Sequence, residues 1–281
     1  KIYDKKLAYP YFVWMVLFTV VPLFIVVYYA LTDSTGSFTL DNLVTVSGYG
    51  SVFARSLLLA LISTVVCLII AFPVGYFLSR LRVNKQHIML MLVMLPMWMN
   101  FLLRTYAWMS ILENNGFING FFRSIGLISF LQTHFGYTLD YIPLINTQGA
   151  IVLGMVYNFL PFMVLPIYNV LVKIDKDVIS AARDLGAGNI QTFTKIILPL
   201  SVPGIISGIT MVFVPALTTF VISNLLGGSK ILLIGNVIEQ EFQQGSNWHV
   251  GSGLSLVLMI FIIASMALIA KYDKDGEGTA F

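Results

Sequence analysis

The side chains of this chain that could handle a solute lie inside strongly apolar segments. Aromatic faces and amide or hydroxyl oxygens can hold an ammonium group without a buried carboxylate. The residues of these types that we single out are Trp98, Asn100, Tyr157, Phe220, Ser223 and Asn224. Because weak binding allows release, this set suits a path for a cation better than a tight binding site. Ordinary packing in an apolar core is the alternative explanation for each of these residues.

Arg104 shares its apolar segment with Asn100, and the spacing of four would place both on one helix face, with Pro96 and Trp108 one turn beyond either end. It lies eight residues, roughly 12 Å along a helix, from the outer end of that segment. From there its side chain can extend to the interface or cap carbonyls freed by a kink. Because a cationic solute would be repelled, we interpret Arg104 as part of the structure or of a gate.

The sequence lacks the arrangements that catalysis requires. His87, His134 and His249 fall in different loops, and no His or Cys pair has the spacing of metal ligands. No apolar segment holds two carboxylates for a protease or a proton relay. A glycine-rich phosphate loop ending in Lys-Ser or Lys-Thr is also missing. The chain is therefore predicted not to be an enzyme, and to bind neither a metal nor a cofactor.

The elements that must position these residues are membrane helices. The chain has 281 residues, of which 58% are hydrophobic and 10% charged, and its mean hydropathy is +0.87. Soluble domains carry roughly a quarter charged residues, so the composition predicts an all-α polytopic membrane protein and excludes a soluble or nucleic-acid-binding module. About 20 apolar residues cross a bilayer. The six segments that qualify are 11–31, 56–79, 88–112, 149–172, 201–226 and 251–270.

The positions of Lys and Arg predict that both termini are cytoplasmic. With the N-terminus inside, the inner segments hold 12 of these residues and the outer loops hold 3, and inner loops are the basic ones. The inner set is Lys1, Lys5, Lys6, Arg80, Arg82, Lys85, Lys173, Lys176, Arg183, Lys195, Lys271 and Lys274, and the outer set is Arg55, Arg123 and Lys230. The outer loops also hold six acidic residues, which would attract a cationic solute or simply reflect this sorting.

The inner loop 173–200 has the pattern of two short helices. Asp175 can cap a first helix, Gly186 can end it, and Asn189 can cap a second helix that runs to Ile197. The apolar positions of the first helix are Val178, Ile179, Ala182 and Leu185. The pattern fits both a compact knob, whose Ala-Ala face packs into a groove of a partner, and an amphipathic linker on the membrane surface.

This loop resembles the cytoplasmic signature of permease subunits of ATP-binding-cassette (ABC) importers. That signature reads Glu-Ala-Ala, three residues, Gly, nine residues, Ile-x-Leu-Pro. The matching positions here are Ser180, Ala181, Ala182, Gly186, Ile196, Leu198 and Pro199, with Ser180 in place of the usual Glu. The resemblance implies a type I importer permease fold, in which this loop, Ala187 included, is the coupling helix that docks on an ATPase subunit.

A narrower resemblance points to permeases of spermidine/putrescine importers. Its third-span motif corresponds here to Pro96, Trp98, Asn100, Leu102, Arg104 and Tyr106, and a second block runs from Gly227 to Ile238. Asn224 stands where such permeases often have Asp, and an amide offers an ammonium group only its carbonyl. The resemblance implies a bacterial-type cell membrane, a second related permease subunit, an external solute-binding protein, and two ATPase subunits that bind ATP and Mg.

Two other functions stay open at this point. A permease of the same family for another small solute is one, since the external binding protein does much of the selecting. A secondary transporter is the other; it would be expected to show an intramembrane acid or an inverted repeat, and the sequence shows neither.

Overall fold

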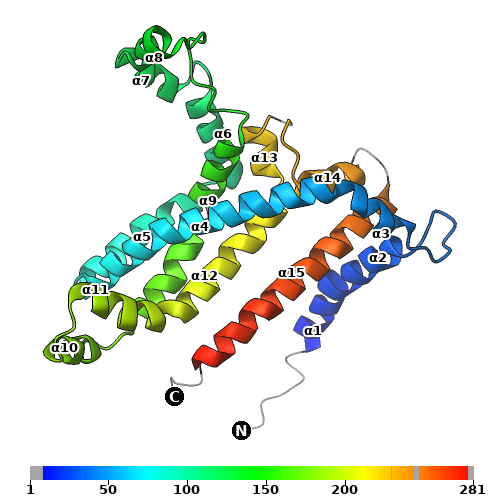
Figure 1. The fold of residues 1–281 in the computed structure, drawn as a ribbon. Coiled ribbons are helices and arrows are strands. Elements are labelled where there is room, and N and C mark those ends of the chain that lie inside the picture. Colours follow the sequence, from blue (N-terminus) through cyan, green and yellow to red (C-terminus); the bar gives the residue numbers. More distant parts are fainter. Residues whose placement is uncertain (1–8, 229, 244–246, 278–281) are drawn as a thin grey trace.

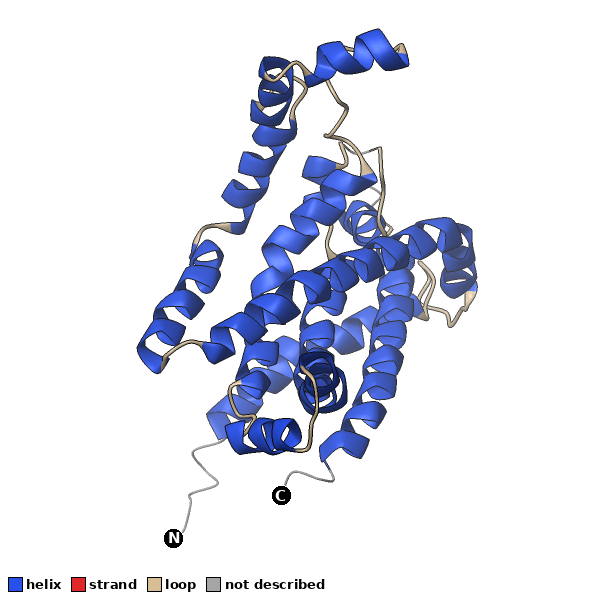
Figure 2. Ribbon diagram, turned by 60° about the vertical axis from the view of Figure 1, so that its left-hand side comes forward, coloured by secondary structure: helices blue, strands red, loops and turns tan. Residues whose placement is uncertain are grey.

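The structure is a computed structural model that describes residues 9–228, 230–243 and 247–277. In these ranges the chain is helical and forms no strand, apart from an isolated bridge between Thr32 and Phe38 (Figure 2). Tilted long helices form a bundle, and short helices cover its ends (Figure 1). The all-α prediction is confirmed. Five helical stretches are long and apolar enough to cross a membrane, and a sixth is reached if one strongly bent pair of helices is counted as one span.

Three long helices make the core of the bundle: α4 (Gly50–Arg80), α9 (Gln148–Leu171) and α12 (Leu198–Thr218). Each packs against the other two. Glycines permit the closest approach of α12 to α9, since a Cβ on Gly204 would lie 2.8 Å from the carbonyl oxygen of Pro166. Small residues at helix contacts are the usual means of bringing membrane helices together, because lipid removes the hydrophobic drive for association.

The first and last expected spans lie side by side. The first consists of α1 (Tyr9–Met15), a π-helical turn (Val16–Val20) and α2 (Val21–Ala30), and the last is α15 (Trp248–Glu277). Contacts join α2 to α15. The start of α1 and the end of α15 lie at the lower end of the bundle in Figure 1, as does the inner loop 173–200.

Two of the expected spans are not single helices. The third divides into α5 (Val83–Trp98) and α6 (Phe101–Leu112), and the stretch that begins with α6 is bent by 86° from α5. The fifth ends at Thr218, and α13 (Val221–Leu226) follows as a separate helix. The expected spans 88–112 and 201–226 are therefore each divided between two helices. A hydropathy pattern does not register a break that leaves the residues apolar.

The other end of the bundle carries the remaining short helices. They are α3 (Asp41–Val46), α7 (Phe117–Ser124), α8 (Leu127–Phe135) and α14 (Ile234–Gln243). Figure 1 shows α7 and α8 standing beyond α6, away from the bundle. In the turn after α2, hydrogen bonds from the Thr35 hydroxyl and the Ser37 amide hold the pKa of Asp33 below its ordinary value.

Candidate functional site

The first helix of the inner loop begins and ends as the sequence predicts. The helix is α10 (Lys176–Asp184), and the Asp175 carboxylate accepts a hydrogen bond of 2.9 Å from the amide of Asp177. Gly186 has φ +84°, the left-handed region that favours glycine. The amide of Ala187 donates to the carbonyl of Ala182 and that of Gly186 to the carbonyl of Arg183, which is a Schellman end. The corner of the loop therefore depends on the backbone of Gly186.

The second helix starts differently from the prediction. It is α11 (Asn189–Thr192), continued by a π-helical turn (Phe193–Ile197), and its cap is Gly188. The side-chain oxygen of Gln191 accepts a hydrogen bond of 3.2 Å from the amide of Gly188. Asn189 is the first helical residue, so its predicted capping role was wrong. The Gln191 side chain instead satisfies the amide of Gly188, the residue that precedes the helix.

The two faces of α10 separate residues that the sequence grouped together. Ile179 and Ala182 are buried against the rest of the chain, whereas Val178 is 46% and Leu185 90% exposed. Ala181 is exposed on the face of α10 that points away from the bundle, whereas Ala182 is buried. The two alanines therefore do not form the common face that the sequence suggested. The residues that form the outward apolar stripe are Val178, Ala181, Leu185 and, on α11, Ile190. Ser180 is exposed, and its hydroxyl donates to the carbonyl of Lys176 within α10.

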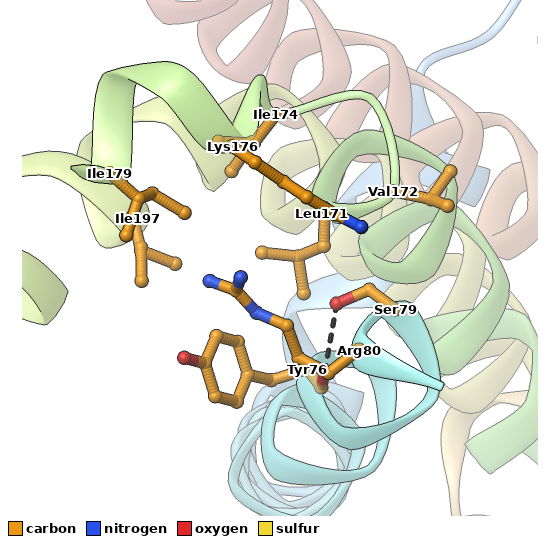
Figure 3. Close-up of a pocket in the computed structure, with 9 residues that line it drawn as sticks. All are labelled: Tyr76, Ser79, Arg80, Leu171, Val172, Ile174, Lys176, Ile179 and Ile197. Atoms are coloured by element: carbon orange, nitrogen blue, oxygen red, sulfur yellow. Dashed lines mark hydrogen bonds between the residues drawn. The ribbon is translucent and has the colours of Figure 1, made fainter. Parts of the chain in front are cut away.

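Behind α10, a small cavity separates the loop from the bundle (Figure 3). Tyr76 and Arg80 reach it from the end of α4, and Ile179 and Ile197 close it from the loop. The Arg80 guanidinium lies 5.1 Å from the centre of the Tyr76 ring, a cation–π contact. Leu198 and Pro199 follow Ile197 at the start of α12. The loop is thus joined directly to a core helix.

Gln86, which the sequence did not single out, closes the same end of α4. Its side-chain amide donates to the carbonyls of Ser79 and Leu81 at 3.1 and 2.9 Å, and its oxygen accepts from the Tyr168 hydroxyl. Carbonyls at the end of a helix lack partners within that helix, so Gln86 satisfies them and ties α4, α5 and α9 together. Gln86 lies seven residues after an expected span, and no sequence pattern there indicates that its side chain closes the end of a helix.

Asn100 has a role in the break between α5 and α6. Its side-chain oxygen accepts hydrogen bonds from the amides of Leu102 and Leu103, which makes it the cap of α6. Asn100 and Arg104 therefore do not share one face of a continuous helix with Pro96 and Trp108, as the spacing suggested. Asn is favoured at caps because its side chain competes with the helical backbone.

Arg104, in the first turn of α6, is 7% exposed. Among the described residues, its Nε and Nη1 atoms are enclosed and have no hydrogen-bond acceptor. These atoms neither reach the interface nor cap a carbonyl, which are the two positions that the sequence suggested. Asn158 on α9 is 2% exposed, and its side-chain oxygen likewise has no donor.

The structure joins Phe220, Ser223 and Asn224 through Asn236 of α14. The Asn236 side chain donates to the carbonyl of Phe220 at 3.0 Å and to Oδ1 of Asn224 at 2.7 Å. Its own oxygen accepts from the Ser223 hydroxyl at 2.6 Å and from the Leu233 amide at 2.9 Å. Ser223 and Asn236 are buried, and Asn224 is half-buried. Asn236 lies within the Gly227–Ile238 block, but no spacing in that block indicates its partners.

The expected aromatic residues do not gather into one group. The ring of Tyr157 packs edge-on against Trp108 of α6, with ring centres 5.3 Å apart. Phe220, 38% exposed, lies at the break after α12, and Trp98, 75% exposed, ends α5. α6 nevertheless contacts both α9 and α13, so most of these residues lie on helices that meet.

The family comparison decides what kind of protein carries this loop and these broken helices. Residues 7–272 match the model of the inner membrane component of binding-protein-dependent transport systems. The chain belongs to this family. The match includes every expected span and the inner loop between the fourth and fifth.

Individual members of the family are similar over nearly the whole chain. The spermidine/putrescine transport system permease protein PotB of Escherichia coli is 39% identical over 264 residues, covering 91% of this chain and 92% of PotB. PotB of Haemophilus influenzae is 36% identical, covering 94% and 91%. The inner membrane ABC transporter permease protein YdcU of E. coli is 29% identical, covering 78% and 71%.

Solved structures show the same fold at much lower sequence identity. A chain of a bacterial alginate ABC transporter, solved with an alginate-bound periplasmic protein, matches with a TM-score of 0.72 at 16% identity. That match covers 94% of this chain and 91% of the transporter chain. A chain of the MetNI methionine ABC transporter in an inward-facing conformation matches with a TM-score of 0.54, covering 80% of this chain. This inner membrane component therefore has the type I importer permease fold.

Proposed function

We propose that this chain is a permease subunit of an ATP-driven importer of linear polyamines, and forms half of the translocation path. The similarity to two PotB proteins, at 36% and 39% identity over more than nine-tenths of the chain, carries this proposal. The six acidic residues assigned to the outer loops favour a cationic solute as well. The solute enters from a binding protein on the outer side.

In this function the inner loop is the coupling element. Gly186 fixes the corner, Ala182 and Ala187 pack beside it, and the outward stripe of Val178, Ala181, Leu185 and Ile190 enters a groove of an ATPase subunit. Exposed apolar side chains on a short helix are the usual anchors for such a groove. Ser180 stands where the signature usually has Glu, so this position makes no charged contact with the ATPase subunit. Leu198 and Pro199 pass the movement of the loop to α12.

ATP and Mg are bound by the two ATPase subunits, not by this chain. Their closure moves the coupling loops and converts the path from inward- to outward-facing. One chain supplies one coupling loop, whereas two ATPase subunits present two docking grooves. A second permease subunit therefore completes the path.

The path itself uses groups that hold a cation weakly. Asn224 offers a half-buried carbonyl, and Phe220, Tyr157 and Trp98 offer aromatic faces. Ser223 and Asn236 hold Asn224 in place through their hydrogen bonds. Asn100 shapes the broken third span, and Arg104 belongs to its structure or gate.

Both termini lie in the cytoplasm in this proposal. Single cysteines on a Cys67→Ala background test the topology, since Cys67 is the chain's one cysteine. A membrane-impermeant thiol reagent added outside should label cysteines at Asp140 and Glu239 and leave those at Arg82 and Gly186 unlabelled. Labelling at Arg82 would contradict the orientation.

Uptake by cells tests the substrate. Cells that carry this chain with its partner subunits should accumulate labelled spermidine or putrescine, and cells without the chain should not. Excess unlabelled polyamine should compete, and an amino acid or an oligosaccharide should not. Competition by another solute alone would favour an ABC importer of different specificity. Uptake that persists without ATP hydrolysis would favour a secondary transporter.

A further inference from the structure

A cavity opens at the end of the bundle opposite the inner loop, where α14 contacts both α12 and α15. Its volume is about 380 Å³, within the range of small-molecule sites. The residues that line it are Thr218, Phe220, Gly235, Ile238, Glu239, Phe242, Gln243 and Leu258. None of these residues is basic, and one of them, Glu239, is acidic.

One face of α14 forms a wall of this cavity. The positions on that face are Gly235, Ile238, Glu239 and Phe242, which follow the i, i+3, i+4 and i+7 spacing of a single helix stripe. The stripe brings a carboxylate and an aromatic ring to the same cavity from one short helix.

The charge of Glu239 has no compensation from the described part of the chain. Its side chain is half-buried, and no described residue donates a hydrogen bond to it or forms an ion pair with it. Glu241, two residues further along α14, instead accepts a hydrogen bond of 3.1 Å from the Tyr49 hydroxyl. Both carboxylate oxygens of Glu239 are therefore available to a donor that enters the cavity.

The broken end of α12 adds partial negative charge to the cavity. α12 ends at Thr218, and the last carbonyls of a helix have no amide partner within it. Gly235 allows α14 to approach this end, since a Cβ there would lie 2.6 Å from the Thr218 carbonyl oxygen and 2.9 Å from that of Thr219. At the start of α14, the amide of Ile234 already donates to the Ser56 hydroxyl.

The other walls suit an organic cation. Phe220 and Phe242 offer aromatic rings, whose faces attract cations, and the Phe242 ring packs edge-on against Trp248 with ring centres 5.7 Å apart. Ile238 and Leu258 offer apolar walls for methylene groups. A metal ion fits less well, because it would need several oxygen ligands, and the described residues hold no group of three His, Cys, Asp or Glu side chains.

The cavity is also connected to the groups already assigned to the path. Asn236, on the same helix as Glu239, donates hydrogen bonds both to the carbonyl of Phe220 and to Oδ1 of Asn224. This link fixes α14, and with it Glu239, against the break that carries Phe220 and Asn224.

We propose that this cavity binds one ammonium group of the solute, with Glu239 as its ion-pair partner and with Phe220 and Phe242 as aromatic walls. The methylene chain next to that ammonium group lies against Ile238 and Leu258. The proposal rests on the polyamine function proposed above, and it adds a charged site to the neutral groups named there.

Glu239→Gln tests the site in proteoliposomes that hold the complete transporter. The variant keeps the shape of the side chain but loses the ion pair, so spermidine uptake at limiting solute should fall about tenfold. ATP hydrolysis stimulated by the loaded solute-binding protein should persist, because the inner loop is unchanged. Glu239→Asp should retain more uptake than Glu239→Gln. Glu241→Gln is the matched control, since it removes the same charge from the same helix and should transport as wild type.

A cysteine in the cavity wall reports on the ligand directly. Gln243 is exposed and lines the cavity, so Gln243→Cys on the Cys67→Ala background should react with a thiol reagent. In the complex of permease and ATPase subunits without the solute-binding protein, spermidine should slow this reaction several-fold. Sodium chloride of equal ionic strength should not slow it. Adding Glu239→Gln should abolish the protection.

The results that overturn the proposal are separable from a failure of the proposed function. Wild-type uptake by Glu239→Gln, with no protection of Gln243→Cys by spermidine, would remove the site and leave the polyamine function standing. Reduced copurification of the second permease with Glu239→Gln, again without protection, would show that a basic side chain of that subunit occupies the cavity. A wild-type transporter that takes up no polyamine would overturn both the site and the function.

Discussion

At the scale of single residues, the corner of the inner loop depends on a backbone conformation rather than on a contact. Gly186 has φ +84°, and a Cβ built there would meet nothing within 4 Å. Gly188, two residues on, has an equally open Cβ position but φ −69°. Substituting the two glycines in turn therefore distinguishes the effect of backbone strain from the effect of an added side chain.

Gly186→Val should impair coupling without harming the membrane helices. A Cβ in the left-handed region costs roughly 1–2 kcal/mol, and a β-branched side chain costs more, so the corner should open. Expression should stay near normal, while copurification of the ATPase subunit and polyamine uptake should fall. Gly188→Val is the control and should behave as wild type, since its backbone is open to any residue. Equal, normal uptake by both variants would favour the surface-linker interpretation of this loop.

Asp substitutions at the two alanines should act by different routes. Ala181→Asp places a charge on the outward stripe, so ATPase docking should fall while the Tm of the isolated chain stays unchanged. Ala182→Asp buries a charge between α10 and the bundle, which costs several kcal/mol, so the loop itself should be destabilised. Limited proteolysis of the loop should therefore accelerate for Ala182→Asp alone. Equal proteolysis of both variants would contradict the separation of the two faces.

Residue-level prediction from the sequence succeeded where one residue determines a local conformation. Asp175 and Gly186 act through the few residues beside them, so their spacing was sufficient. It failed where the partner is distant: Asn236 contacts Phe220 and Asn224, and Gln86 contacts Tyr168, 82 positions away. No local pattern contains such pairings.

At the scale of elements, the break between α5 and α6 depends on the cap at Asn100. Asn100→Ala removes the acceptor for two amides at the start of α6 and should lower stability by about 1 kcal/mol. Asn100→Asp keeps the acceptor and should retain more of the thermal stability of the purified chain. A Tm for Asn100→Ala equal to that of wild type would show that the cap does not hold the break.

The link from α13 to α14 tests the path role of Asn224. Asn224→Asp keeps the acceptor for Asn236 and adds a negative charge, so uptake should be preserved or raised. Asn224→Lys should abolish uptake, because it loses the hydrogen bond and repels the cation. Asn224→Met loses only the hydrogen bond and should retain partial uptake. Equal uptake by the Lys and Met variants would show that Asn224 does not face the path.

The sequence predicted how many membrane segments there are and that they are helical, but it did not predict where a segment is broken into two helices. Apolar length was sufficient to find the membrane segments. The breaks at Met99 and Thr219 were not predicted, because the hydropathy of both segments stays high across the break. The polar residue that marks the first break, Asn100, was instead assigned to a helix face.

At the scale of the whole molecule, one chain presents two incomplete surfaces. The outward stripe of α10 and α11 is apolar and exposed on the inner loop, and the face of α6 that carries Leu102, Leu103 and Tyr106 is apolar and exposed as well. A chain of an alginate ABC transporter has the same fold, and that transporter was solved with a periplasmic protein. The central claim is accordingly that movement of the solute through this chain is driven by ATPase subunits through the inner loop.

The most direct test is to measure ATP hydrolysis and labelled spermidine uptake together in proteoliposomes. The liposomes would hold the complete transporter, with the solute-binding protein on the outer side and either wild-type chain, Gly186→Val or Gly188→Val. The account predicts that spermidine-loaded binding protein stimulates both activities for wild type and Gly188→Val. For Gly186→Val, uptake should be lost and any remaining hydrolysis should not respond to the loaded protein. Stimulated uptake by Gly186→Val at the wild-type rate would contradict the account.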